Sequence, residues 1–256
     1  MNKLKLFFIF IFIFVFVAVH TQAQIVNVES LRKVTDTSKW SGNVGLNLSL
    51  IKNKNDIFKV TNRAHLQYLN KRNLYLIVAN LNFQQLDSNK FVNSGTIHLR
   101  YNYKLKPKTA LEVFFQSQYD AVSNISLRSL SGLGPRFKLG NSDKYKFYLG
   151  TLVMHEYEKS TETFGTNINR DLLGSGYLSF SLYPTNQFSI VSTTYYQPNL
   201  KEFADYRISN DTSLAFEVYK GLGFKSTFNL LFDAFPPMGV PKTQYTWTNG
   251  IVYTFD

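Results

Sequence analysis

Histidine, serine and carboxylate side chains are the groups of this chain that could carry acid–base, nucleophilic or metal chemistry. The four histidines are His20, His65, His98 and His155, and the chain has no cysteine. A zinc site needs two or three convergent ligands at defined spacing, and the sequence has no HxxxH pair or carboxylate–histidine cluster. The lack of cysteine excludes disulfide scaffolds, thiolate metal sites and thiol nucleophiles. We therefore predict no metal site and no cofactor.

A serine and a histidine two positions apart on one strand face would allow nucleophilic attack on envelope lipid, as in outer-membrane phospholipases. The residues two positions after His65, His98 and His155 are glutamine, arginine and tyrosine. None of these supplies the serine, so we predict no catalytic residue. An enzyme whose catalytic groups lie on separate strands stays open as an alternative.

The segment Gly132-Leu133-Gly134-Pro135-Arg136 has the glycine content of a phosphate-binding loop. It lacks the GK[ST] ending and the following helix of such a loop. Proline removes a hydrogen bond from a β-ladder, and glycine permits a bulge or kink. We therefore predict a bend in a strand here and no phosphate site.

Charged and histidine side chains recur on the polar faces of alternating segments, and these are our candidates for residues that line an interior. They are Arg63, His65, His98, Arg100, Glu112, Arg128, Arg136, Arg207, Asp211, Glu217, Lys225 and Asp233, with Lys104 and Lys138 on the same faces. They could form a structural network that fills a narrow interior, or line a polar channel. In a channel, the surplus of Lys and Arg would favour anionic or neutral solutes over cations.

Strands with one apolar and one polar face must position these side chains. Between residues 97 and 105 one face carries Ile97, Leu99, Tyr101, Tyr103 and Leu105, and the other carries His98, Arg100, Asn102 and Lys104. This period of two is the pattern of a β-strand. Aromatic residues near strand ends could form girdles at two membrane interfaces; examples are Tyr101, Tyr103, Phe180, Tyr183, Tyr195 and Tyr196.

The alternation predicts about twelve strands from Trp40 to the end of the chain. Their ranges are 40–52, 56–69, 73–86, 91–105, 109–122, 125–139, 144–159, 171–184, 187–198, 205–220, 224–235 and 243–255. The connections alternate between short turns and longer links, of which 160–170, 199–204 and 236–242 are the longest. Outer-membrane barrels combine short periplasmic turns with longer external loops, so the parity fits a barrel whose N-terminus is periplasmic.

The outward apolar rows require lipid or a core to cover them, and the polar rows cannot serve as that core. A closed sheet leaves no bare strand edge in hydrocarbon. We therefore predict an all-β fold, a transmembrane antiparallel β-barrel of about twelve strands. A soluble sandwich or ligand-binding barrel is the alternative. A mean hydropathy of −0.16 excludes a helical membrane bundle, and a hydrophobic content of 44% excludes disorder.

Residues 1–23 have the pattern of a cleaved signal peptide: Lys3 and Lys5, an apolar run from Leu6 to Val19, then small residues ending at Ala23. We predict a short periplasmic segment over 24–39 and an outer-membrane barrel over 40–256. The formal net charge of +11 and the aromatic content are typical of nucleic-acid binding. Export away from the cytoplasm argues against that partner, so we predict no nucleic acid.

Several short segments resemble one known family. They are Val28 to Arg32 before Trp40-Ser41-Gly42, Leu99 to Tyr103, Gly132 to Leu139, and Lys144 to Glu158. They are similar to the salt-induced outer-membrane protein family, domain of unknown function 481, and to its branch in Bacteroidota. The resemblance covers nearly all of the mature chain and implies a Gram-negative outer-membrane barrel. It carries no catalytic or ligand residue to transfer, because the family's activity is unassigned. The last segment, Tyr245 to Phe255, also resembles the C-terminal assembly signal of outer-membrane barrels, with Asp256 following the terminal Phe.

These observations leave three functional hypotheses. The first is an envelope structural component or narrow passive channel of the porin type. The alternatives are an envelope-lipid-modifying enzyme and a protein that presents its surface loops to a partner. The expected partners are outer-membrane lipid, lipopolysaccharide and, during biogenesis, the barrel-assembly machinery.

Overall fold

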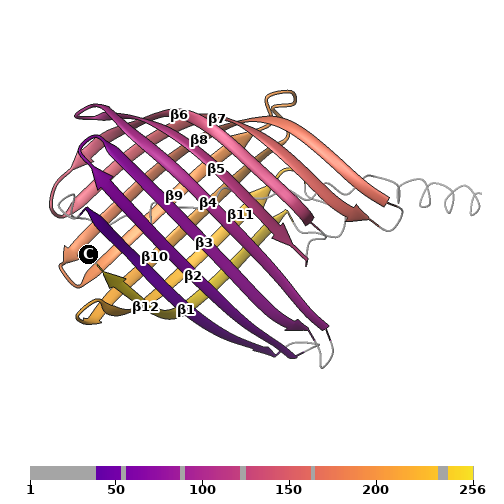
Figure 1. Ribbon diagram of the computed structural model, residues 1–256, viewed down its shortest axis with the longest axis horizontal. Helices are drawn as coiled ribbons and strands as arrows, with labels where there is room; N and C mark the ends of the chain where they lie inside the picture. The colour runs from indigo at the N-terminus through magenta and orange to yellow at the C-terminus, as the bar shows by residue number, and fades with distance from the viewer. Residues whose placement is uncertain are drawn as a thin grey trace, which may run out of the picture.

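The computed structural model describes residues 39–52, 56–86, 90–121, 125–162, 165–235 and 242–255. Within these ranges the chain forms twelve antiparallel strands that close into a barrel (Figure 1). The strands are β1 (Trp40–Lys52), β2 (Asp56–Asn70), β3 (Asn73–Leu86), β4 (Lys90–Lys106), β5 (Thr109–Asp120), β6 (Ile125–Asn141), β7 (Tyr145–Glu162), β8 (Gly165–Thr185), β9 (Phe188–Pro198), β10 (Tyr206–Tyr219), β11 (Leu222–Asp233) and β12 (Thr243–Phe255). The predicted signal peptide, 1–23, and the predicted periplasmic segment, 24–39 apart from Lys39, lie outside the described residues. No helix in the described ranges is long and apolar enough to cross a bilayer.

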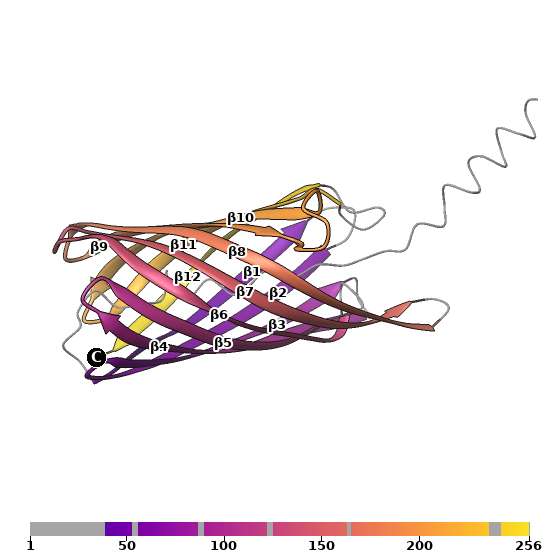
Figure 2. The same ribbon diagram turned by 90° about the horizontal axis from the view of Figure 1, so that it is seen from above.

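The strand boundaries follow the period-two pattern closely, with one large difference. The predicted external loop over 160–170 is wrong for most of its length, because β7 continues to Glu162 and β8 already begins at Gly165. Ser160 pairs with Asn167 and Thr161 with Thr166, so the two strands extend as a hairpin. Figure 2 shows this hairpin projecting beyond the rest of the barrel wall.

Each strand pairs with its neighbours in the sequence, and β1 pairs with β12 to close the sheet. Closure matters because backbone groups that face hydrocarbon can find no water partner. The closing seam is short, since it joins only five residue pairs, from Gly42↔Phe255 to Leu46↔Ile251. Beyond Leu46, β1 pairs with β2 alone, and Figure 1 shows β1 and β12 diverging away from the chain end marked C.

The two ends of the barrel differ in their connections. The turn end holds the start of β1, the end of β12 and short turns such as Lys71-Arg72, Pro107-Lys108 and Lys220-Gly221. Lys71, Lys220 and Gly221 have positive φ there, as tight hairpin turns require. The opposite end, called the loop end here, holds the longer connections over 199–205 and 234–242. The predicted parity of short and long connections is therefore confirmed for these links.

The barrel is apolar outside and polar inside. On β4 the exposed fractions of Ile97 and Leu99 are 45% and 40%, whereas those of His98 and Arg100 are 0% and 3%. Most of the other strands repeat this arrangement, but the inward rows of β3 and β7 also include buried apolar side chains such as Leu76, Val78 and Leu152. A soluble sandwich would bury the apolar rows instead. The predicted class, a transmembrane antiparallel β-barrel, is confirmed.

Aromatic side chains gather near both ends of the outer wall. At the turn end, rings contact one another across four strands, in the order Trp40, Tyr68, Tyr75 and Tyr101. Toward the loop end, the Tyr206 ring contacts those of Tyr196 and Phe232. Such belts are typical of the two membrane interfaces.

Two residues predicted for these belts lie elsewhere. Tyr195 has an exposed fraction of 0% and belongs to the interior, and Tyr183 lines an interior cavity. Both residues occupy positions of the period-two alternation whose side chains face the interior. Their aromatic character alone does not indicate which face of the strand they occupy.

The predicted bend at Gly132 to Arg136 is not accompanied by a bulge. β6 keeps one register from Leu133↔Val153 to Arg136↔Gly150, and the irregularity lies further on, between Lys138 and Gly140. A Cβ on Gly134 would collide with the backbone of Thr151 and Leu152 on β7. The glycine is therefore required for the close approach of two wall strands.

Candidate functional site in the barrel interior

The structure brings most of the twelve predicted interior residues together inside the barrel. Nine have side chains that are at least nine-tenths buried: His65, His98, Arg100, Glu112, Arg128, Arg136, Arg207, Asp211 and Asp233. Arg63 and Lys225 are half-buried. Glu217 is exposed at the turn end, where its Oε1 accepts a hydrogen bond of 2.8 Å from the backbone N–H of Gly221.

Glu112 is the centre of one interior network. Its Oε1 accepts hydrogen bonds from Asn102 Nδ2 at 2.6 Å and from Arg136 Nη1 at 3.3 Å, and its Oε2 accepts one from the Tyr177 hydroxyl. Arg100 Nη1 lies 3.6 Å from the same carboxylate. Glu112 is on β5 and Tyr177 on β8, so the network crosses the interior between strands that are not neighbours. Buried charges need such pairing, because an uncompensated charge in a low dielectric is costly.

Arg128 is the centre of a second network, toward the loop end. Its Nη2 lies 2.9 Å from Glu158 Oε2 and 3.2 Å from Glu156 Oε1. Arg207 on β10 extends the network, with Nη1 3.9 Å from Glu156 Oε2 and Nε 3.7 Å from Asp233 Oδ2. Glu156 and Glu158 were not among the predicted residues. The network joins β6 and β7 to β10 and β11 across the interior.

The buried charges of the described interior balance. The cationic residues that are at least nine-tenths buried are Arg100, Arg128, Arg136, Lys146 and Arg207, and the anionic ones are Glu112, Glu156, Glu158, Asp211 and Asp233. The surplus of basic residues seen in the sequence therefore lies outside these two networks.

The histidines lie in different environments. His98 Nδ1 is 3.1 Å from Gln116 Oε1, and Arg100 donates its Nε–H to His98 Nε2 at 3.3 Å. His65 Nδ1 is 3.4 Å from the side-chain amide of Asn43. His155, whose face the sequence left open, is exposed on the outer wall. The described residues include no group of three or more potential metal ligands.

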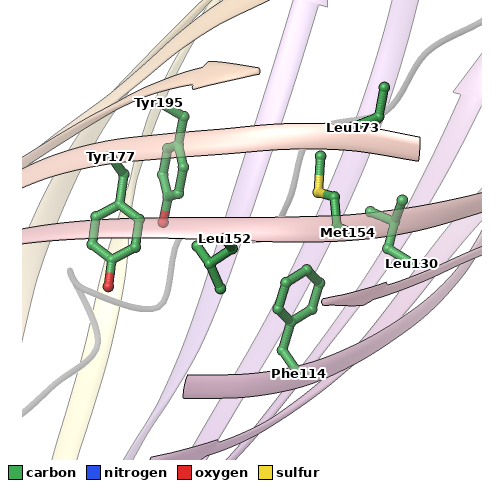
Figure 3. Packing of buried hydrophobic residues seen from close by; sticks show 7 residues of the cluster. All are labelled: Phe114, Leu130, Leu152, Met154, Leu173, Tyr177 and Tyr195. Atoms are coloured by element: carbon green, nitrogen blue, oxygen red, sulfur yellow. The ribbon is translucent and has the colours of Figure 1, made fainter. Parts of the chain in front are cut away.

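An apolar cluster inside the barrel was not predicted. Figure 3 shows its seven members converging from β5 to β9: Phe114, Leu130, Leu152, Met154, Leu173, Tyr177 and Tyr195. Tyr177 belongs both to the cluster and to the Glu112 network. The sequence feature that could have predicted the cluster is the alternation along β7, where Leu152 and Met154 share the inward face with Glu156 and Glu158. That signal was weak because the outward residues Leu149 and Val153 are equally apolar.

Two cavities lie at the turn end, on opposite sides of the barrel. One has a volume of about 220 Å³ and is lined by His65, Tyr183, Glu217 and Lys225, among others. The other has a volume of about 300 Å³ and lies between β2 and β7, with Asn102 and Arg136 of the Glu112 network in its lining. The interior is thus hollow at the turn end and filled by side chains at the apolar cluster and the two charged networks.

The family model described as "Protein of unknown function, DUF481" matches residues 53–255. The chain belongs to the DUF481 family. No curated protein matches its sequence. This DUF481 protein shares its fold with solved outer-membrane proteins. An outer-membrane channel from Pseudomonas putida F1 is 10% identical, with a TM-score of 0.53 over 91% of this chain and 100% of the channel. The NanC porin is also 10% identical, with a TM-score of 0.52 over 85% of this chain and 100% of the porin. At this identity the likeness concerns the fold alone.

Proposed function

We propose that this DUF481 protein resides in the outer membrane of a Gram-negative cell and provides a narrow passive pathway for small polar solutes. The observation that carries the proposal is the sidedness of the closed wall. Its outer surface is apolar with aromatic belts, and its interior holds charged side chains and two cavities. A wall of this kind needs lipid outside, and a polar interior lowers the cost of moving a polar solute through it.

The narrowest part of the pathway is the apolar cluster together with the Glu112 and Arg128 networks. These groups join strands that are three apart in the sheet, from β5 to β8 and from β7 to β10. Solute passage therefore depends on side-chain volume at the cluster, and truncation there should widen the pathway.

Conductance of purified protein in a planar bilayer tests the proposal. The variant pair is Leu152→Ala with Met154→Ala, and the matched control is Val153→Ala, because Val153 lies between them and has an exposed fraction of 50% on the outer wall. We expect small steps from the wild type, larger steps from the double variant and unchanged steps from the control. The gel mobility of each protein shows that it is folded. The absence of conductance steps from all three folded proteins, even at high protein concentration, would refute a pathway.

A second candidate is an interaction protein, and the projecting β7–β8 hairpin favours it. Ile168 on this hairpin has an exposed fraction of 50%. Removal of residues 161–166 would then abolish capture of a defined partner and leave conductance unchanged. Loss of both properties would count against this role, because it would indicate a damaged barrel.

The remaining expectations belong to the same proposal. They are a cleaved leader over 1–23, contact with outer-membrane lipid and lipopolysaccharide, and delivery by the barrel-assembly machinery. Membership of the Bacteroidota branch and an enzyme acting on envelope lipid stay predictions from the sequence.

A further inference from the structure

The cavity of about 300 Å³ at the turn end has an unusual charge. Six cationic residues surround it: Lys71, Arg72, Lys104, Lys106, Lys108 and Lys138. A seventh, Arg136, lies at its floor, and none of the lining residues is Asp or Glu. The other turn-end cavity contains both Glu217 and Lys225. Among the charged residues that line the cavity between β2 and β7, all are therefore cationic.

The floor of this cavity is held in place. Arg136 is buried and donates a hydrogen bond to Glu112, and its guanidinium carbon lies 3.8 Å from the centre of the Tyr148 ring. Asn102, which also lines the cavity, donates to the same carboxylate. Glu112 thus provides a counter-charge for the buried Arg136 guanidinium, whereas no Asp or Glu lines the cavity beside the lysines.

The lysine ammonium groups come from separate elements. Lys71 is on the β2–β3 turn, Lys104 and Lys106 end β4, and Lys138 is on β6. Lys104 and Lys138 share the inward face of their strands with Asn102 and Arg136, so they point into the mouth and not toward the lipid. Like charges around one cavity repel one another, and an anion that binds among them relieves that repulsion.

We propose that this basic cavity binds a small soluble oxyanion carrying two or more negative charges, of the phosphorylated or polycarboxylate class. The volume suits a compact ligand, at the lower limit of known small-molecule sites. Flexible lysines bind such groups as point charges, without the fixed fork geometry of arginine. Binding requires only that the turn end faces water, so it does not depend on conduction through the barrel.

Titration calorimetry with inorganic pyrophosphate tests the site in the full-length barrel in phosphatidylcholine nanodiscs at low salt. The test variant carries Lys104→Gln and Lys138→Gln. The control is Lys144→Gln, because Lys144 is exposed at the same end and does not line the cavity. We expect the wild type and the control to bind equally. We expect the double variant to bind at least about tenfold more weakly, which corresponds to about 1.4 kcal/mol, because two of the cationic groups that face the ligand are removed. Binding should weaken steeply with added salt.

Two results would overturn the proposal. The first is equal affinity of all three proteins, or equal weakening by the control substitution, because either would indicate diffuse surface charge. The second is loss of pyrophosphate binding in nanodiscs of phosphatidylglycerol, since this would assign the site to a lipid headgroup. Conductance of the same protein preparations in planar bilayers separates failure of this site from failure of the pathway.

Discussion

Removing the carboxylate of Glu112 should destabilise the barrel more than any other single charge deletion in the Glu112 network. Glu112 has an exposed fraction of 0% and is contacted by Asn102, Arg136, Tyr177 and Arg100. In Glu112→Ala, the Arg100 and Arg136 guanidiniums lose their shared counter-charge while staying buried. Breaking a buried pair in this way costs about 3–5 kcal/mol.

Urea unfolding in detergent micelles, followed by tryptophan fluorescence, measures this loss. The variant Glu112→Gln keeps one acceptor oxygen, for either Asn102 or Tyr177, and fills the same volume, so it should lose less than Glu112→Ala. Glu217→Ala is the control, because Glu217 is exposed and makes only a turn contact, so its cost should be about 1 kcal/mol or less. Replacing Arg136 by Met in the Glu112→Ala background should recover part of the loss. An effect of Glu112→Ala as small as that of Glu217→Ala would refute the idea that this network holds the interior together.

Two further predictions concern the wall. The chain has no cysteine, and Val44 is opposite Tyr253 across the closing seam, so Val44→Cys with Tyr253→Cys should form a disulfide in the folded barrel. The control pair, Val44→Cys with Trp247→Cys, is about 20 Å out of register and should stay reduced. Equal oxidation of both pairs on a non-reducing gel would contradict the pairing of β1 with β12. Gly134→Val should lower the free energy of unfolding by about 1–3 kcal/mol, because the valine side chain would collide with the β7 backbone. Gly176→Val should be nearly neutral, because there is open space where its Cβ would lie. Similar urea midpoints for these two variants would show that the close approach of β6 and β7 at Gly134 is unimportant for stability.

The period of two made most of the fold predictable from the sequence. Lipid-facing and interior residues alternate along each strand, so a row such as Ile97, Leu99 and Tyr101 indicates both the strand and its outward face. The parity of short and long connections then indicates which barrel end holds the termini. The hairpin over 160–170 was missed because its Asn, Thr and Gly residues are typical of loops, and the pairing of Ser160 with Asn167 is a cross-strand property.

The interior was predictable by residue type but not by partner. Parity placed Arg100, Glu112 and Arg136 on inward faces, yet Tyr177 is 65 positions from Glu112, and no local pattern links them. The apolar cluster was missed for a different reason. In a narrow barrel the inward side chains pack against one another, so an inward residue such as Met154 need not be polar.

The central claim, that the apolar wall contacts acyl chains, is tested most directly at Trp247. Its side chain has an exposed fraction of 70% on β12, and its indole N–H donates to Ser226 Oγ at 2.8 Å. The chain has two tryptophans, so Trp40→Phe leaves Trp247 as the sole indole fluorophore. We predict strong quenching of this variant in liposomes of lipids brominated on the acyl chain, and weak quenching by acrylamide in water. Fluorescence unaffected by brominated lipid, with strong quenching by acrylamide, would contradict the claim.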